Sequence, residues 1–173
     1  MGTIHVVQGS VVDMPTDAIV NAANSSLLGG GGVDGAIHSA AGPELYKECL
    51  TLGGCETGQA KITKGYRLKA KYVIHTVGPV YCGREKDALL LASCYKNSMD
   101  LALEHDLKSI SFCCISTGVY GYPLRDASEI ALSTVKAWLN SHPEAGIDVY
   151  FCCFSPREYA VYTELMEKAG FSS

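Results

Sequence analysis

The sequence predicts an α/β fold in which a central sheet carries helices on both faces. Short apolar segments alternate with longer amphipathic segments along the chain, a pattern typical of sheets covered by helices. With 173 residues, the chain can bury the core of one domain but is too short for two full-sized ones. Its hydrophobic content of 47% and charged content of 18% are those of an ordinary globular protein. We therefore expect one compact domain that spans residues 1–173.

Five short apolar segments are predicted to form strands. Runs of this length and composition, bounded by polar or turn-forming residues, are typical of buried strands. The predicted strands cover residues 4–8, 18–21, 72–76, 109–115 and 148–154.

Five amphipathic segments between and after these strands are predicted to form helices. The clearest follows Pro123, a residue typical of the first helical turn, and repeats apolar or small side chains at helical spacing. The last is expected to end at Gly170, because glycine favours the left-handed conformation of a C-terminal cap. In chain order, the five predicted helices cover residues 33–41, 43–52 and 87–105, the stretch after 123, and residues 156–169.

Two loops rich in small residues follow strands and lead into helices. The first lies in NAANSSLLGGGGVDGAIH at residues 21–38, and the second is STGVYG at residues 116–121. In an α/β sheet, ligands bind at the carboxyl ends of the strands, and helix N-termini favour anions. Glycine also lets the backbone approach a ligand closely. Together the two loops are suited to hold a diphosphate.

Three common enzyme motifs are incomplete or absent. Gly30, Gly32 and Gly35 match the G-x-G-x-x-G pattern of dinucleotide-binding folds, but residues 24–29 separate this pattern from the strand that it should follow directly. The chain contains no G-x-x-x-x-G-K-[ST] P-loop and no G-x-S-x-G nucleophile elbow. A nicotinamide dehydrogenase and a P-loop enzyme are therefore disfavoured.

Charge and hydropathy exclude several kinds of partner. The net charge is −4 at pH 7, and no run of Lys and Arg could follow a phosphate backbone, so we do not expect nucleic acid as a main partner. The first residues lack a secretory signal, and no segment approaches the length of about 18 apolar residues that a membrane span needs. Met1-Gly2-Thr3 begins like a myristoylation site, but Val6 stands where Ser or Thr is required. We expect a cytoplasmic monomer without membrane association.

The eight cysteines do not form a metal-binding or disulfide pattern. None belongs to a Cys-x-x-Cys pair, and two adjacent pairs, at 113-114 and 152-153, lie in predicted strands, where neighbouring side chains point to opposite faces. We expect these thiols to be reduced and to fill the core. The five histidines show no zincin spacing either. No metal and no cofactor is expected.

Four motifs occur together in the order found in a known family. They are DAIVNAAN at residues 17–24, GGGGVDGAIH at 29–38, IHTVGP at 74–79 and ISTGVYGYP at 115–123. With these motifs the chain resembles, over about residues 3–169, the macro domain family, in particular its bacterial O-acetyl-ADP-ribose deacetylase branch, grouped with the MacroD-type hydrolases. The resemblance implies a three-layer α/β/α fold with a mixed sheet and an ADP-ribose cleft between the two loops. It also implies removal of ADP-ribose from acidic side chains of proteins and hydrolysis of O-acetyl-ADP-ribose.

The resemblance further implies roles for particular residues. Asn24 would contact the distal ribose, and Asp34 would orient or activate the attacking water as a general base. Main-chain amides of residues 116–120 would hold the diphosphate, with Tyr120 beside the distal ribose, while Phe154 would stack on adenine. The expected catalytic residues are Asn24 and Asp34, and the expected substrate-binding residues are Ser10, Val11, Ala23, Asn24, Gly30, Gly31, Gly32, Val33, Asp34, Ser116, Thr117, Gly118, Val119, Tyr120 and Phe154.

Each of these side chains also fits a purely structural role. Asn24 could cap its own loop, and Asp34 could cap the helix that follows it. Tyr120 fits a surface turn, and Phe154 fits a core position at the end of a strand. His38 lies one helical turn beyond Asp34 on the same face, and we expect it to be structural.

Residue 10 departs from the family pattern. The family has Gly-Asp-Ile where this chain has Gly9-Ser10-Val11, and the family's aspartate accepts a hydrogen bond from the adenine 6-amino group. A serine hydroxyl can also accept this bond, but it carries no charge. Because hydrogen bonds to charged groups contribute about 1.5–3 kcal/mol and neutral ones about 0.5–1.5, we expect adenine binding to weaken by about 1 kcal/mol, up to about tenfold in affinity.

An alternative function is a module that binds ADP-ribose or poly-ADP-ribose without turning it over. The presence of both Asn24 and Asp34 favours the enzyme. ADP-ribosylated proteins are the partners that the enzyme requires. The sequence leaves open whether water attacks the ester carbonyl or the anomeric carbon.

Overall fold

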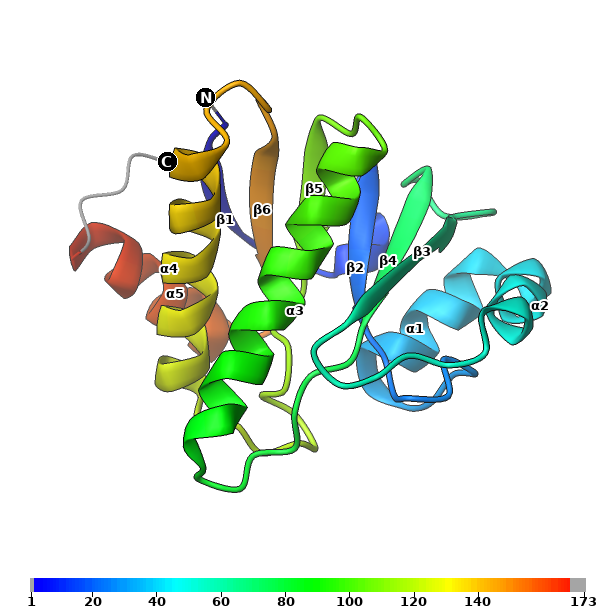
Figure 1. Cartoon of the computed structure of the whole chain (residues 1–173), viewed down its shortest axis with the longest axis horizontal. Helices are drawn as coiled ribbons and strands as arrows, with labels where there is room; N and C mark the ends of the chain where they lie inside the picture. The colour runs from blue at the N-terminus through cyan, green and yellow to red at the C-terminus, as the bar shows by residue number, and fades with distance from the viewer. Residues whose placement is uncertain (1, 169–173) are drawn as a thin grey trace.

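A six-stranded sheet forms the centre of the molecule (Figure 1). The computed structural model describes residues 2–168, and within them the strand order is β1-β6-β5-β2-β4-β3. Neighbouring strands are parallel, except that β3 pairs antiparallel with β4, so the sheet is mixed. The strands are β1 (Ile4–Gln8), β2 (Ala18–Ala22), β3 (Ala60–Lys64), β4 (Tyr72–Thr76), β5 (Ser109–Phe112) and β6 (Asp148–Cys153).

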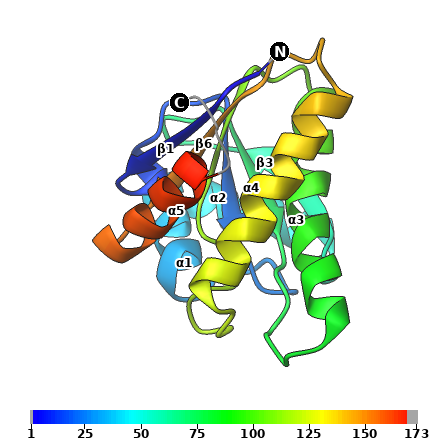
Figure 2. The same cartoon turned by 90° about the vertical axis from the view of Figure 1, so that its left-hand side faces the viewer.

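Helices cover both faces of this sheet. Figure 2 shows α3 and α4 on one side of the sheet and α1 and α5 on the other. This three-layer α/β/α arrangement confirms the predicted fold class. The α-helices within residues 2–168 are α1 (Gly32–Ala41), α2 (Pro43–Leu52), α3 (Glu85–Glu104), α4 (Leu124–Ser141) and α5 (Pro156–Lys168), and a 3-10 helix, η1, covers Val11–Asp13.

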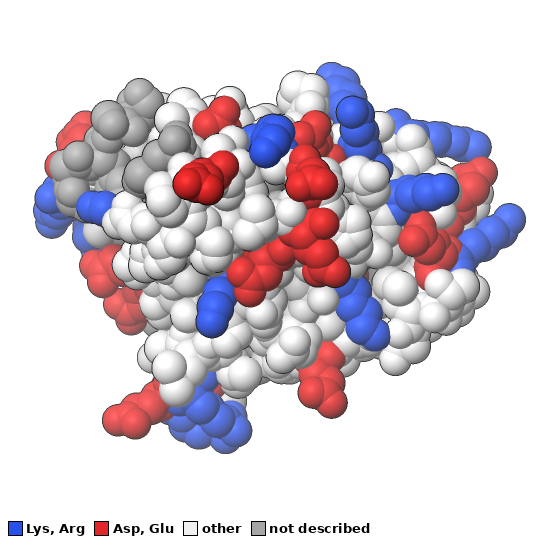
Figure 3. All heavy atoms as spheres, turned by 45° about the horizontal axis from the view of Figure 1, so that its top comes forward, with Lys and Arg blue, Asp and Glu red and all other residues white. Residues whose placement is uncertain are grey.

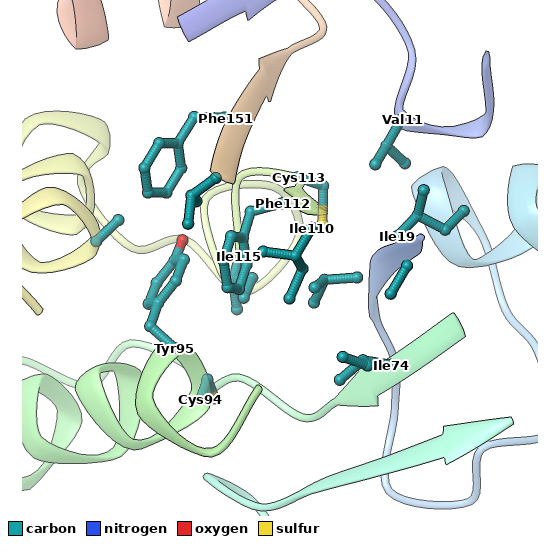
Figure 4. Packing of buried hydrophobic residues seen from close by; sticks show 14 of the residues in the cluster. Val11, Ile19, Ile74, Cys94, Tyr95, Ile110, Phe112, Cys113, Ile115 and Phe151 are labelled. Atoms are coloured by element: carbon teal, nitrogen blue, oxygen red, sulfur yellow. The ribbon is translucent and has the colours of Figure 1, made fainter. Parts of the chain in front are cut away.

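The buried core extends over both faces of the sheet, and its largest group of packed rings lies where the central strands meet α3. Phe112 of β5 stacks on Phe151 of β6 with ring centroids 5.6 Å apart, and Tyr95 of α3 approaches Phe112 at 5.0 Å. Figure 4 shows Tyr95 rising from α3 toward these rings. All three side chains are buried: the two strands are covered on both faces, and Tyr95 lies on the side of α3 that packs against them. This packing fixes the carboxyl ends of β5 and β6, from which two walls of the cleft described below begin.

One strand was not predicted, and two are shorter than predicted. The missed strand β3 reads AKITK, with two lysines and few apolar residues, because it forms an edge of the sheet. β5 ends at Phe112 rather than at residue 115, since its pairing with β6 stops there, and β6 ends at Cys153 rather than at residue 154. The predicted end of the last helix at residue 169 and its cap at Gly170 lie outside the described residues.

The cysteines are free thiols. Cys113, Cys152 and Cys153 are buried in the core, as predicted, whereas Cys114 is half-buried and packs against it, and three of the four, Cys113, Cys114 and Cys152, also border the cleft described below. Burial raises the pKa of Cys113 and of Cys152 to about 12, so both thiols stay protonated. Among the described side chains, no group of three or more His, Cys, Asp and Glu is arranged to hold a metal ion.

The surface carries both signs of charge. On the face shown in Figure 3, Lys and Arg side chains are interspersed with Asp and Glu rather than joined in a continuous basic stripe. Such mixing gives no track for a phosphate backbone on that face. Across residues 2–168, every helix is too short or too polar to cross a membrane.

Candidate active site

A cleft of about 670 Å³ opens beyond the carboxyl ends of the parallel strands. This volume is in the range of small-molecule sites. Its walls come from the segments that follow β1, β2, β5 and β6, which are distant in sequence but meet at the same edge of the sheet. Every residue predicted to bind substrate lines this cleft: Ser10, Val11, Ala23, Asn24, Gly30, Gly31, Gly32, Val33, Asp34, Ser116, Thr117, Gly118, Val119, Tyr120 and Phe154. Their roles toward a ligand stay predictions.

Asn24 holds the first loop, residues 23–31, in shape. Its Nδ2 donates a hydrogen bond to the carbonyl oxygen of Gly29 at 2.8 Å. Its Oδ1 accepts hydrogen bonds from the backbone N–H of Leu27 and from the hydroxyl of Ser26. Asn24 therefore has the loop-capping role that the sequence analysis considered, and the same side chain also faces the cleft.

The glycine run meets two different requirements. Gly32 has a φ of +59°, in the left-handed region that glycine adopts most readily. Gly30 is a place of close approach, since a Cβ built there would lie 3.3 Å from both Asn24 Nδ2 and Asp34 Oδ2. The backbone of the first loop thus passes directly beside the two side chains that were predicted to be catalytic.

Asp34 is a buried carboxylate at the wall of the cleft. It lies in the first turn of α1, where the helix dipole favours negative charge, and its exposed fraction is 4%. Asn21 Nδ2 donates a hydrogen bond to Asp34 Oδ1 at 2.9 Å, whereas Oδ2 is the oxygen near Gly30. Gly31 precedes the helix as its N-cap and has no side chain to cap it, so Asp34 serves this end of the helix through its charge in the first turn rather than as the N-cap residue.

His38 lies against the same carboxylate. Its Nε2 is 3.4 Å from Asp34 Oδ1, and 14% of its side chain is exposed. Its ring also lies beside Gly29: a Cβ atom built on Gly29 would be 3.8 Å from His38 Cδ2. The ring therefore braces the first loop and confines the carboxylate, and its expected structural role stays a prediction.

Two buried polar residues behind Asp34 were given no role by the sequence analysis. Asn21 on β2 and His75 on β4 are fully buried and paired in register, and Asn21 Nδ2 lies 3.1 Å from His75 Nδ1. Their polarity was the signal in the sequence that could have pointed to them, because polar side chains inside otherwise apolar parallel strands require hydrogen-bond partners. The pattern alone did not show which partners they meet.

The second loop, residues 116–121, is held by backbone hydrogen bonds and by two side-chain hydroxyls. Tyr122 donates a backbone hydrogen bond to the carbonyl of Ser116 at 2.9 Å, and Ser116 Oγ donates to the carbonyl of Pro79. Within the described part of the chain, the N–H groups of residues 117–120 donate no hydrogen bond to another protein group. Residues 117–120 line the cleft, so their unpaired donors are available to bind an anion there.

The far end of the cleft carries an exposed ring. Phe154 is 78% exposed, so the alternative that it fills the core is wrong. Ser10 stands in the same cleft, and so does Glu158, which the sequence analysis missed. Glu158 Oε1 accepts from the N–H of Ser155 while Ser155 Oγ accepts from the N–H of Glu158, and this S-x-x-E capping box was readable in the sequence.

Sequence comparison shows which proteins the chain is related to. The sequence model of the Macro domain family matches residues 20–131. The chain is 58% identical over 165 residues to a macro domain-containing protein of Chlorobaculum tepidum, covering 94% of this chain and 95% of that protein. It is 53% identical to the ADP-ribose glycohydrolase MACROD1 of Mus musculus over 93% of this chain, and it spans 50% of the length of that relative.

Solved structures agree with the sequence comparison. The Trypanosoma brucei macrodomain in complex with ADP-ribose matches with a TM-score of 0.90 and 51% identity, over 94% of this chain and 68% of that chain. The Oceanobacillus iheyensis macrodomain with ADP matches with a TM-score of 0.91 and 44% identity, over 97% of this chain and 92% of that chain. The chain therefore belongs to the macro domain family, and it is similar to the family's MacroD-type members.

Proposed function

We propose that the protein is an ADP-ribose-binding hydrolase that removes mono-ADP-ribose from acidic side chains of proteins and deacetylates O-acetyl-ADP-ribose. The observation that carries this proposal is the placement of Asp34. One of its oxygens is held from behind by Asn21, and the other lies beside Gly30 and the cleft. Relatives named ADP-ribose glycohydrolase, at 53 and 54% identity, support the same reaction class.

The cleft suits the parts of ADP-ribose in one order. The unpaired N–H groups of residues 117–120 are donors for the diphosphate. The exposed ring of Phe154 offers a stacking surface for adenine at one end. The distal ribose then lies at the other end, between the first loop and Tyr120, within reach of Asn24 and Asp34. Macrodomain structures with ADP and ADP-ribose bound support this type of ligand.

Asp34 is suited to act as a general base. Both reactions hydrolyse an ester on the distal ribose, so a water molecule must lose a proton as it attacks. A carboxylate in a buried site can accept that proton. The proton then passes to the ribose oxygen that leaves when the carbonyl carbon is attacked, or to solvent when attack at the anomeric carbon releases a carboxylate, which needs no proton at neutral pH. This role is the same whether water attacks the carbonyl carbon or the anomeric carbon.

A direct assay tests the hydrolase. Incubation with a protein carrying mono-ADP-ribose on glutamate is expected to release free ADP-ribose, and incubation with O-acetyl-ADP-ribose is expected to release acetate, both measurable by mass spectrometry. If neither product forms although calorimetry shows ADP-ribose binding, the protein is a reader module and the hydrolase proposal is wrong.

We also propose that residues 1–173 form one macro domain that acts as a cytoplasmic monomer on ADP-ribosylated proteins. The free thiols support a reducing compartment, since disulfides are typical of oxidising ones. Light scattering after size exclusion tests the monomer, because a dimer would elute with twice the mass of the chain.

A further inference from the structure

A chain of buried polar side chains leads from the edge of the sheet to Asp34. It passes through Thr63 on β3, His75 on β4 and Asn21 on β2, which are neighbouring strands. Thr63 Oγ1 lies 2.9 Å from His75 Nε2, Asn21 Nδ2 lies 3.1 Å from His75 Nδ1, and Asn21 Nδ2 lies 2.9 Å from Asp34 Oδ1. None of the three strand residues is more than 2% exposed. The function proposed above gives His75 and Thr63 no role.

The chemistry of the groups sets the direction of each hydrogen bond. An amide nitrogen can only donate, so the two N–H groups of Asn21 go to the carboxylate of Asp34 and to an unprotonated Nδ1 of His75. The ring proton of His75 therefore lies on Nε2, from which it is donated to the Thr63 hydroxyl. Turning the Asn21 amide over would place its oxygen against Asp34 Oδ1, a carboxylate oxygen that cannot donate, so Asp34 sets the orientation even though the buried Asn21 Oδ1 has no hydrogen-bond partner among the described residues. The amide thus has one favourable orientation.

We propose that His75 is a positioning residue for hydrolysis: it holds the Asn21 amide, and Asn21 holds one oxygen of Asp34 so that the other faces the cleft. This proposal rests on the proposed role of Asp34 as the base. The two oxygens then have separate tasks, since Oδ1 meets Asn21 and Oδ2 lies near Gly30. A displacement of about 1 Å at a reacting group can lower a rate about 100-fold, so a fixed carboxylate matters.

Burial keeps the His75 ring in the form that this arrangement needs. It lowers the pKa of His75 to about 3, with a smaller contribution from the charge of His38. The ring of His38 stands 6.4 Å from that of His75, and the Cys49 thiol lies 4.0 Å from His75 Nε2. At neutral pH the ring is therefore uncharged, and its Nδ1 remains an acceptor for Asn21.

The proposal is tested by comparing His75→Leu with His75→Asn. Leucine removes the acceptor, so kcat is expected to fall about 10- to 100-fold while the affinity for ADP-ribose stays within about threefold. Asparagine can place its Oδ1 near the position of Nδ1, so it is expected to recover most of kcat. Steady-state kinetics on O-acetyl-ADP-ribose and calorimetry with ADP-ribose give the two quantities. A His75→Asn protein as slow as His75→Leu, at equal melting temperature, overturns the proposal.

Thr76→Val is the matched control. Thr76 is the next residue of β4, is also fully buried, and donates its hydroxyl to the carbonyl of Gln59, away from Asp34. It does not line the cleft. This variant is expected to lose stability and keep kcat. If Thr76→Val lowers kcat as much as His75→Leu does, then removing any buried polar side chain from β4 slows the enzyme, and the proposal is wrong.

A double variant tests the route through Asn21. If His75 acts through this amide, then His75→Leu added to Asn21→Ala lowers kcat no further, whereas independent effects would multiply. If His75→Leu fails to fold, Thr63→Val replaces it, with a smaller expected loss of kcat and the same non-additivity. Multiplying effects overturn the proposal in either case.

Nuclear magnetic resonance separates this proposal from the proposed function. The ring nitrogens of His75 in the wild-type protein are expected to show the proton on Nε2 and none on Nδ1. The opposite tautomer, with hydrolysis intact, overturns the positioning proposal alone. Wild-type protein that binds ADP-ribose without hydrolysis, in contrast, overturns the proposed function and with it the catalytic meaning of the buried chain.

Discussion

The two loops of the cleft differ in the groups that they leave available to a ligand. The first loop, residues 23–31, is held by the side chain of Asn24, and the helix after it carries Asp34, which is held from behind by Asn21. The second loop, residues 116–121, is held by backbone hydrogen bonds and by the hydroxyls of Ser116 and Thr117, and within the described residues it keeps the N–H groups of residues 117–120 unpaired. A fixed side chain suits bond cleavage, whereas unpaired backbone donors suit the binding of a diphosphate.

This difference predicts that the two loops affect different kinetic quantities. Changes at the Asp34 side of the cleft should lower kcat with little effect on affinity. Changes at the second loop and at the far end of the cleft should alter affinity and leave kcat in place. A substitution near Asp34 that lowers only affinity, or one in the second loop that lowers only kcat, would show that catalysis and binding are not divided between the loops in this way.

The largest effect is expected from Asp34→Ala. Removal of the base should lower kcat about 100- to 10,000-fold, while the affinity for ADP-ribose stays within about tenfold. Asp126→Ala is the control, because Asp126 is a carboxylate in the first turn of α4 and does not line the cleft. Equal rates for Asp34→Ala and wild type would remove Asp34 from the mechanism.

Acid should destabilise the protein through His75. Burial lowers its pKa to about 3 from the model-compound value of 6.5, so between these pH values the unfolded chain binds a proton that the folded chain does not. The free energy of unfolding should therefore fall as pH falls through this window, by up to about 1.4 kcal/mol per pH unit. Urea denaturation from neutral to acidic pH measures the slope. The His75→Asn protein should have a shallower slope, and identical slopes would contradict the assignment.

Ser10→Asp should tighten binding at the adenine end. A carboxylate accepts a stronger hydrogen bond than a hydroxyl does, so the affinity for ADP-ribose is expected to rise by up to about tenfold with kcat unchanged. Calorimetry checks the affinity. Unchanged or weaker binding would mean that adenine is held elsewhere than beside residue 10.

Ser116→Ala should weaken the second loop. It removes the hydrogen bond from Ser116 Oγ to the carbonyl of Pro79, which is expected to cost about 1 kcal/mol of stability. If the loop holds the diphosphate as proposed, KM should rise while kcat stays near the wild-type value. Kinetics that show a lower kcat and an unchanged KM would contradict the division of tasks between the loops.

The smallest effect is expected from Val119→Ser. The Val119 side chain is fully exposed, so the free energy of unfolding should change by less than about 0.5 kcal/mol. Affinity should also persist, since the substitution retains the backbone N–H that is proposed to meet the diphosphate. Thermal denaturation and calorimetry check both. A large loss of affinity would mean that the side chain of Val119 contacts the ligand directly.

The sequence allowed most elements of the fold to be predicted because their patterns are local. The strands β1 and β4 and the helix α2 have the predicted bounds, since their apolar spacing and their flanking Gly and Pro residues lie within a few positions. β3 was missed because an edge strand with two lysines owes its structure to pairing with β4, a partner that follows a separate turn.

The candidate site likewise has parts that local motifs predicted and parts that only the folded structure revealed. The two loops and the residues that line the cleft could be located from motifs, because glycine runs and helix starts are continuous in the chain. Those motifs also contained Asn21 and His75, but the sequence assigned them no partner. Only the register between β2 and β4 brings these two side chains together, and only the placement of α1 on the sheet brings Asp34 to them. Strand register and helix packing depend on contacts between distant segments, so they follow from the folded structure rather than from any single stretch of sequence.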